Sequence, residues 1–352
     1  MSPPPELALT EPALRKDAET IAVVGYVHGV SHFFHLVLPS LYPWLMREFG
    51  LSYTQVGVAM TLFFVVSGIG QALAGFAVDR FGARRVLLAG MGFLGLSTAV
   101  LSIAPAYPVL LLAGLLAGVG NSVFHPADFS LLNRKLPTAR LGHAFSVHGV
   151  SGAIGWAAAP ILVTALAAAE GWRVAALAAS LVALSGIVLV LWRNDSTREA
   201  APVRQQPHAD AKPEGALAFL AVPEVWMCFA FFLAASTAFG ALQSYLPTAL
   251  DHGFGMPVTV AALAMSAFLL GTAFGTAAGG FVAGGRFGQD RVIAAALAFA
   301  ALLAVLLAGG AMPQWAIAPM LGAIGFAIGM AGPSRDLLVR RAAASRFAQA
   351  AY

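Results

Sequence analysis

Long apolar runs separated by short polar segments recur along the chain from residue 21 to residue 333. A helix needs about 20 predominantly apolar residues to cross a bilayer, and these runs are of that order. The short alternating segments of an outer-membrane barrel do not fit, because the runs are continuous. The pattern therefore predicts an all-α membrane protein of about ten transmembrane helices, at residues 21–46, 55–78, 86–104, 108–132, 143–169, 173–192, 223–247, 258–283, 292–312 and 315–333.

The composition excludes an ordinary soluble domain. Of the 352 residues, 59% are hydrophobic and 10% are charged, whereas soluble domains carry about 25% charged residues. The 37 glycines suit helices that pack closely in lipid. Cys228 is the single cysteine, so no disulfide framework is expected. The net charge is +4, but the sequence has no run of basic residues interspersed with aromatic ones, as nucleic-acid binding would need. No nucleic-acid partner is therefore expected.

The positions of Lys and Arg predict the orientation of the helices. With the N-terminus in the cytoplasm, the inner polar segments hold all but Arg47 and Arg173 of the 20 Lys and Arg residues. Such residues concentrate on the cytoplasmic side of membrane proteins. A polar tail precedes the first apolar stretch, which is too long for a cleavable signal peptide. We expect a multi-pass protein of the inner (plasma) membrane, with its N-terminus in the cytoplasm and the lipid bilayer around it.

One long polar segment divides the chain into two parts. It contains Pro202, Pro207 and Pro213, and its composition predicts a flexible cytoplasmic linker. Six spans precede the linker and four follow it. The expected organisation is a cytoplasmic tail at 1–20, a six-helix bundle at 21–192, the linker at 193–222, an incomplete four-helix bundle at 223–333 and a cytoplasmic tail at 334–352.

The two parts carry related motifs in equivalent inner loops, after the second and the eighth span. The second copy includes Gly280, Arg286, Gly288 and Arg291. A repeat between two halves is typical of secondary transporters. The first copy resembles the signature of the major facilitator superfamily, and its matching residues are Gly75, Asp79, Arg80, Gly82, Arg84 and Arg85. The resemblance implies a helical bundle of the major-facilitator type.

A narrower resemblance lies at the end of the fourth span. Phe124, His125 and Pro126, with a glycine-rich fifth span after them, resemble the fosmidomycin-resistance group of drug exporters. The chain departs from that group where Ala127 replaces a glutamate, with Asp128 one position later. The resemblance implies a secondary active transporter for a small organic solute or drug, working by alternating access as a proton-coupled efflux antiporter. Uptake of a metabolite or carboxylate is the alternative transport function.

The superfamily has twelve spans, two more than this sequence predicts. A truncated gene, a shifted reading frame or an incomplete chain is the expected explanation, and a ten-helix carrier is the alternative. A transport-inactive truncated membrane protein therefore remains a further alternative to a carrier.

The fourth span also holds a polar cluster. Asp128 is the only carboxylate well inside a span, where a charge costs at least about 2.5 kcal/mol. His125 precedes it by three residues, so both lie on one helical face. Pro126 leaves the carbonyl of Ser122 without its helical hydrogen bond. The cluster could bind a proton or a polar substrate, or form a polar helix end near the headgroups, and His125 is favoured because it lies deeper.

Three histidines form a stripe on the first span. The spacing of His28, His32 and His35 puts them on one helical face, and exposing that face to lipid would be costly. The stripe is expected to line a cavity with His125 and bind substrate or carry protons, or to hydrogen-bond neighbouring helices. No metal site is predicted, because no cysteine or carboxylate lies alongside on this span. His148, in the fifth span, is a weaker candidate for the same pathway.

The resemblance gives the loop from Asp79 to Arg85 a gating role on the cytoplasmic side. It implies that Asp79 meets the N-terminal end of an eleventh helix, which the ten predicted spans do not include. Alternatively, the arginines only enforce topology. In two other spans, small residues predict close helix contacts, and these are Gly149, Gly152, Gly155, Gly271, Gly275 and Gly279.

No pattern of enzyme chemistry accompanies these motifs. The phosphate-binding loop of ATP-driven proteins does not occur in the sequence. The glycine-rich segments lie inside apolar helices, a context that does not fit a dinucleotide-binding fold. We therefore expect a protein that is not an enzyme and uses no cofactor. Its expected partners are a small-molecule substrate and protons, and it is expected to be a monomer.

Overall fold

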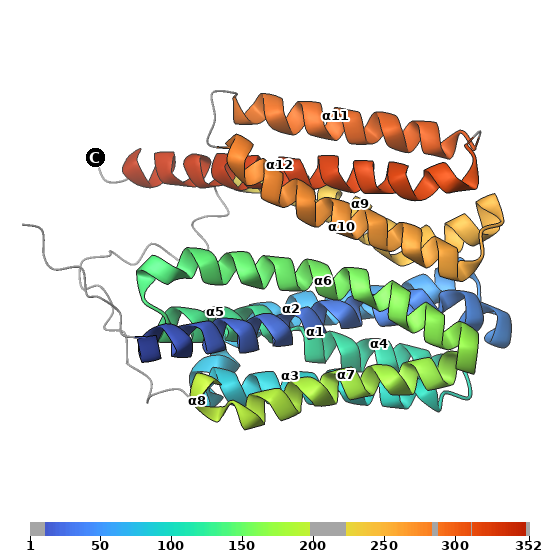
Figure 1. Ribbon diagram of the computed structural model, residues 1–352, viewed down its shortest axis with the longest axis horizontal. Helices are drawn as coiled ribbons and strands as arrows, with labels where there is room; N and C mark the ends of the chain where they lie inside the picture. The colour runs from blue at the N-terminus through green and yellow to red at the C-terminus, as the bar shows by residue number, and fades with distance from the viewer. Residues whose placement is uncertain (1–10, 198–222, 284–287, 311, 350–352) are drawn as a thin grey trace, which may run out of the picture. The chain divides into compact units, whose positions relative to one another are not determined.

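The computed structural model describes residues 11–197, 223–283, 288–310 and 312–349. These residues are helical with short connections, and no strand occurs among them. Within the described ranges, ten spans are long and apolar enough to cross a membrane, which confirms the predicted fold class. The helices, labelled in Figure 1, are α1 (Glu11–Phe49), α2 (Tyr53–Phe81), α3 (Ala83–Ser102), α4 (Tyr107–Asn121), α5 (Phe124–Lys135), α6 (Thr138–Glu170), α7 (Trp172–Trp192), α8 (Asn194–Thr197), α9 (Pro223–Phe254), α10 (Val258–Ala283), α11 (Gln289–Ala308) and α12 (Gln314–Gln349).

The contacts between helices divide the chain into two units, residues 1–202 and 203–352. The first unit contains α1 to α8, and the second contains α9 to α12. Most of the predicted linker, residues 198–222, lies outside the described residues.

Several helices extend beyond the predicted spans. α1 begins at Glu11 rather than at residue 21, α9 continues to Phe254, and α12 continues to Gln349. Residues 11–20 and 334–349, expected in tails, are therefore helical. α11 is displaced toward the N-terminus and ends at Ala308 rather than at residue 312. Hydropathy identifies only the apolar part of a helix that can lie in the lipid. The helix itself continues into polar sequence for as long as its backbone hydrogen bonds continue.

The fourth span consists of two helices instead of one. α4 ends at Asn121 and α5 begins at Phe124, with a turn at residues 122 and 123. Pro126 has no N–H to give to the carbonyl of Ser122, and its ring crowds that carbonyl. The missing hydrogen bond expected at this proline thus coincides with a turn between two helices of one membrane span.

Close contact between α1 and α6 organises the first unit, where the two helices run side by side (Figure 1). A Cβ on Gly155 would collide with the carbonyl oxygen of Gly29, and one on Gly152 would lie 2.7 Å from Nδ1 of His32. The predicted role of these two glycines in close packing is confirmed. The same prediction for Gly149 is wrong, because a Cβ there would meet no atom within 4 Å.

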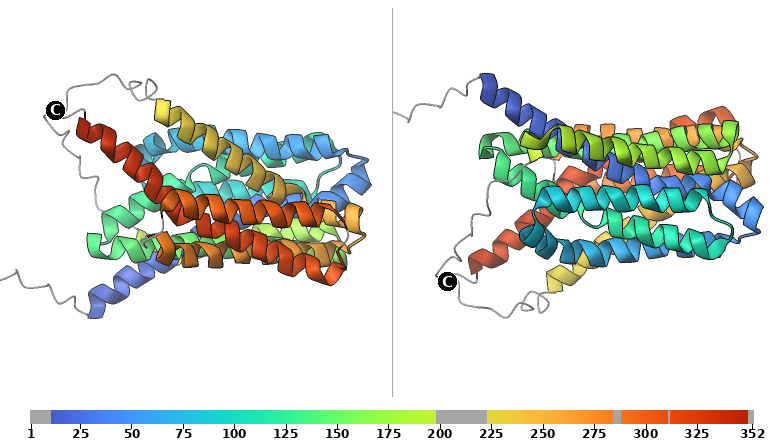
Figure 2. Two further views of the ribbon diagram at one scale, coloured as in Figure 1. Left: turned by 90° about the horizontal axis from the view of Figure 1, so that it is seen from above. Right: turned by 90° about the horizontal axis from the view of Figure 1, so that it is seen from below.

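A second glycine-rich contact joins α10 and α12 in the second unit. Figure 2 shows α12 (red) as one long helix. Cβ atoms on the three glycines of α10 would collide with backbone carbonyl groups of α12. The prediction for these glycines is confirmed, and they are Gly271, Gly275 and Gly279.

Charged side chains join the helix ends of the first unit. At one end, Arg140 lies 3.5 Å from Asp17, and Arg193 lies 3.5 Å from Glu19. At the end of the unit where α1 finishes, Arg173 donates to Glu48 at 2.6 Å. The apolar middle of the unit therefore lies between two polar ends.

Candidate functional site

The predicted polar residues of the first unit come together around Asp128. Its side chain is fully buried, with 0% exposure. Oδ2 lies 3.1 Å from Nδ1 of His28 on α1 and 3.1 Å from Nε2 of His148 on α6. A carboxylate only accepts hydrogen bonds, so each imidazole donates an N–H to this oxygen. Three helices that are distant in the sequence thus meet at one carboxylate.

This arrangement corrects one sequence-based expectation. The chain has no carboxylate beside the histidine stripe on α1, but the fold places Asp128 of α5 next to His28. Asp128 is fully buried and His125 is partly exposed, and the preference for His125 as the functional residue remains a prediction.

The rings of the cluster are in mutual contact. His28 and His148 stack with centroids 3.4 Å apart and an interplanar angle of 22°. The ring centroid of His125 lies 5.0 Å from that of His28 and 6.0 Å from that of His32. The rings of His32 and His125 therefore lie close together, and that they line one water-accessible cavity remains a prediction.

Two polar atoms in the cluster are buried without a hydrogen-bond partner among the described residues. They are Oδ1 of Asp128 and Nδ1 of His32. The His32 ring is packed between His28, with centroids 4.3 Å apart, and Trp156, with centroids 4.2 Å apart. Buried polar atoms normally have partners, so unpaired ones are informative about what a site binds.

His35 belongs to a separate hydrogen-bonded chain. Nε1 of Trp156 donates to its Nδ1 at 3.2 Å, so the Nε2–H donates to Oδ1 of Asn121 at 2.8 Å. Nδ2 of Asn121 in turn donates to Oγ of Ser67 at 2.7 Å. Both nitrogens of His35 are thereby committed, and the chain fixes a neutral tautomer. This supports the structural alternative for His35, and it involves three partners that the sequence analysis did not single out.

The predicted gating loop lies apart from the histidine cluster. Gly75 is inside α2, and Gly82, with φ of 84°, makes the turn between α2 and α3. Oδ1 of Asp79 lies 3.5 Å from the guanidinium of Arg134, near the C-terminal end of α5. The sequence suggested a helix N-terminus as the partner of Asp79 and missed this arginine, which lies 55 residues away in the chain.

The other arginines of the loop have different surroundings. Arg80 and Arg85 are exposed, and Arg80 lies over the ring of Phe81 at 5.4 Å. Arg84 is partly buried, with Nε unpaired among the described residues. The corresponding loop of the second unit includes residues 284–287, which lie outside the described part of the chain.

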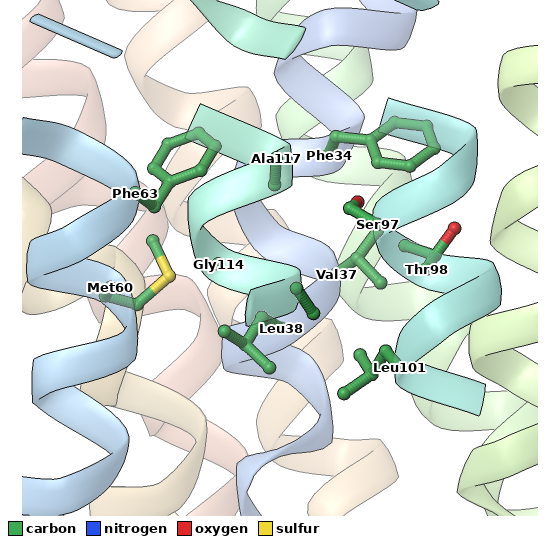
Figure 3. A pocket seen from close by; sticks show the side chains of 11 residues that line it. Phe34, Val37, Leu38, Met60, Phe63, Ser97, Thr98, Leu101, Gly114 and Ala117 are labelled. Atoms are coloured by element: carbon green, nitrogen blue, oxygen red, sulfur yellow. The ribbon is translucent and has the colours of Figure 1, made fainter. Parts of the chain in front are cut away.

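A small cavity lies between α1, α2, α3 and α4 of the first unit (Figure 3). Its volume is about 20 Å³, room for about one water molecule. The hydroxyl groups of Ser97 and Thr98, on its wall, already donate to backbone carbonyls. This cavity is therefore a packing gap and too small for an organic substrate.

Three imidazoles of the cluster have the geometry of candidate metal ligands. His28, His125 and His148 each offer a nitrogen, and these atoms all lie within 4.8 Å of one another. The cluster thus presents a carboxylate and several imidazoles on three helices, a set that can hold a proton, a polar solute or a metal ion.

Comparisons with known proteins agree with the fold. The family profile described as Major Facilitator Superfamily matches residues 26–352. The fosmidomycin resistance protein of Escherichia coli K12 is 28% identical over 279 residues, which are 78% of this chain and 66% of that protein. A probable nitrate/nitrite antiporter of Thermus thermophilus is 27% identical over 262 residues, 71% of this chain and 57% of that protein.

A solved structure has the same fold. It is the crystal structure of a bacterial homologue of the human lysosomal transporter Spinster, in an inward-facing and occupied conformation. The TM-score is 0.64 at 17% identity, over 91% of this chain and 74% of that chain. The present chain spans about two thirds or less of the length of the two curated relatives. The resemblance predicted from the motifs is confirmed at the level of family and relatives.

Proposed function

The chain belongs to the major facilitator superfamily, and from that premise we propose that it is a secondary active transporter of the inner membrane. It moves a small organic solute by alternating access, and it exports that solute in exchange for protons. The ten apolar spans and the bacterial relatives support a multi-pass inner-membrane protein. Transport of a solute, rather than an enzymatic reaction, is the activity that this family membership supports.

The observation that carries the proposal is the burial of Asp128 between two imidazoles. Its carboxylate is 0% exposed inside a unit of apolar helices. Ionisable groups are costly in such surroundings and mark substrate or ion pathways in membrane proteins. We assign the pathway for solute and protons to the cluster formed by His28, His32, His125, Asp128 and His148, with His35 supporting it from the adjacent hydrogen-bonded chain.

Drug export is the preferred direction, because the chain is similar to a fosmidomycin resistance protein. Expression in drug-sensitive Escherichia coli should raise the fosmidomycin concentration that stops growth. Asp128→Asn should abolish that gain, since asparagine keeps the shape of the side chain but removes its charge. The matched control is Asp195→Asn, a carboxylate on the short helix α8, which should retain resistance.

Equal amounts of each variant in the membrane make the comparison valid. Full resistance from Asp128→Asn would refute the assigned pathway, and no resistance from the unaltered chain would refute this drug as the solute. Proton coupling is tested separately in proteoliposomes that contain a pH-sensitive dye. Solute flux that leaves the internal pH unchanged would contradict the exchange for protons.

Uptake of a small anion is the second candidate. The similarity to a probable nitrate/nitrite antiporter, at nearly the same identity, is the observation that favours it. The direction of flux separates the candidates: net accumulation of a carboxylate or nitrate in intact cells supports uptake, whereas drug extrusion supports export.

For the loop, we propose that Asp79 and Arg134 form a contact that changes during gating on the cytoplasmic side. The two side chains lie 3.5 Å apart in this conformation. Cysteines at both positions, cross-linked across the pair, should slow transport, and reduction should restore it. Unaltered transport in the cross-linked protein would show that the contact stays fixed.

A further inference from the structure

We infer that His28, His125, His148 and Asp128 form a binding site for one divalent transition-metal ion of the zinc type. This inference goes beyond the proposed transport function, and it concerns equilibrium binding by the chain itself. The four residues belong to α1, α5 and α6 of the first unit. Imidazole nitrogens and a carboxylate oxygen are the ligands that such ions take in proteins.

The positions of the donor atoms support the assignment. The three imidazole nitrogens lie within 4.8 Å of one another. Tetrahedral zinc, with Zn–N distances of about 2.0–2.1 Å, places neighbouring nitrogens about 3.4 Å apart, so small side-chain movements suffice. Nδ1 of His28 and Nε2 of His148 already converge on one oxygen of Asp128 at 3.1 Å. A metal ion in this space would bind these two nitrogens, and the proton of each ring would then sit on its other nitrogen.

Hydrogen bonding alone leaves two features of the cluster unexplained. Oδ1 of Asp128 is buried without a partner among the described residues. His125 makes ring contacts with His28, His148 and Phe129 there, but no hydrogen bond is recorded for it in the described part of the chain. A metal site would use both the third imidazole and the carboxylate oxygen that has no hydrogen-bond partner. Hydrogen bonds from two imidazoles to one carboxylate oxygen require neither.

The residues around the donor atoms provide access for an ion, shielding from water and a compensating charge. His125 is partly exposed, so it gives an ion access to the otherwise buried donors. Phe129 stacks on His125 with centroids 6.0 Å apart and also contacts His148, which keeps water away from one side. The donor set carries one negative charge, which offsets part of the charge of a divalent ion.

The test uses the full chain, purified in detergent and stripped of metal with a chelator. Zinc chloride alone is then titrated by calorimetry, and Co²⁺ serves as a spectroscopic probe of coordination. We expect one Zn²⁺ per chain and an absorption band of tetrahedral Co²⁺. His125→Gln should weaken binding at least tenfold and abolish the band. This variant removes no recorded hydrogen bond from the described structure, so it is expected to fold.

The controls separate this site from other histidines. His35→Gln, accepted only if it melts cooperatively, alters the same stripe on α1, but both nitrogens of His35 are committed to Asn121 and Trp156, so zinc affinity should stay within twofold. His252→Ala changes an exposed histidine of the second unit and should also leave the affinity unchanged. Asp128→Asn, accepted only if it melts cooperatively, should weaken binding as His125→Gln does.

Zinc binding that is absent from the unaltered chain would overturn the inference, as would full affinity in His125→Gln. The same holds if His35→Gln lowers the affinity as much as His125→Gln. Because no solute or gradient is present, failure of this test leaves the transport proposal standing, and failure of transport leaves the metal site standing.

Discussion

At the scale of single residues, the histidine cluster depends on Gly152, because the absence of a Cβ there leaves space for two of the rings. A Cβ on Gly152 would lie 2.7 Å from Nδ1 and 2.8 Å from Cε1 of His32, and 3.1 Å from Nε2 of His28. Both rings belong to α1, and glycine at this position of α6 makes the room they occupy. The size of the residue at 152 therefore controls the position of the imidazoles next to Asp128.

We expect Gly152→Ala to displace these two rings and to destabilise the first unit by about 1–3 kcal/mol, the usual cost of overpacking. Thermal unfolding in detergent, followed by fluorescence, measures the change. Gly149→Ala is the matched control one turn earlier on α6, since a Cβ there meets nothing within 4 Å. Equal melting temperatures for the two variants would show that the cluster tolerates the extra methyl group.

Asn121 provides a second prediction, because it links three helices through its side chain. It accepts from His35 on α1 and donates to Ser67 on α2 from the end of α4. Asn121→Leu leaves both partners without this hydrogen bond, and an unsatisfied buried polar group costs about 1–3 kcal/mol. The melting temperature should fall accordingly, whereas Asn133→Leu, at an exposed position of α5, should change it little. A smaller fall for Asn121→Leu than for Asn133→Leu would contradict the role of this network.

The sequence identified most of these residues but not their partners. The candidates on α1, α5 and α6 were recognised because ionisable groups are rare in apolar spans. That His28 meets Asp128 could not be predicted, since the two residues are 100 positions apart and only the packing of α5 against α1 brings them together. Asn121 and Trp156 escaped notice because uncharged polar side chains are common in membrane helices and carry little signal on their own.

At the scale of helices, close packing through glycine was predictable, whereas helix ends were not. Glycines spaced by four residues on α10 indicated a contact face, and they meet the backbone of α12. Spacing alone did not separate Gly149 from Gly152 and Gly155, because the rotation of α6 against α1 decides which glycines face the partner. The additional turns of α1 and α12 lie in polar sequence, where hydropathy gives no information about helicity.

We expect Gly275→Leu to push α10 away from α12, because any side chain there would collide with the carbonyl group of Phe326. The destabilisation should reach or exceed about 1–3 kcal/mol, since the backbone contact cannot be relieved by a rotamer change. Gly280→Leu, an exposed glycine of the same helix with nothing within 4 Å, is the control. Proteolysis in detergent and thermal unfolding should both detect the difference. If both variants are equally stable, α10 and α12 do not pack through this face.

At the scale of the whole molecule, the distribution of charge predicts which ends of the helices face the cytoplasm. In the first unit, Arg140 and Arg193 pair with Asp17 and Glu19 near the start of α1. The opposite end of α1 carries Glu48, which pairs with Arg173. Cations therefore gather mainly at the end where the chain begins, and such an excess marks the cytoplasmic side. The ion pairs show which carboxylates bind these cations. The prediction of which end faces the cytoplasm rests on the distribution of the cations and not on the pairs.

The topology can be tested with single cysteines in a background in which Cys228 is replaced by serine. One cysteine is placed in the linker at Pro207, and another at Gly253, in the last turn of α9 before its connection to α10. A membrane-impermeant thiol reagent added to intact cells should label Gly253→Cys only, because we expect the linker to lie in the cytoplasm. After the cells are permeabilised, both variants should react, which shows that each thiol is accessible. Labelling of Pro207→Cys but not of Gly253→Cys in intact cells would invert the topology, and the polar end near Asp17 would then face outward.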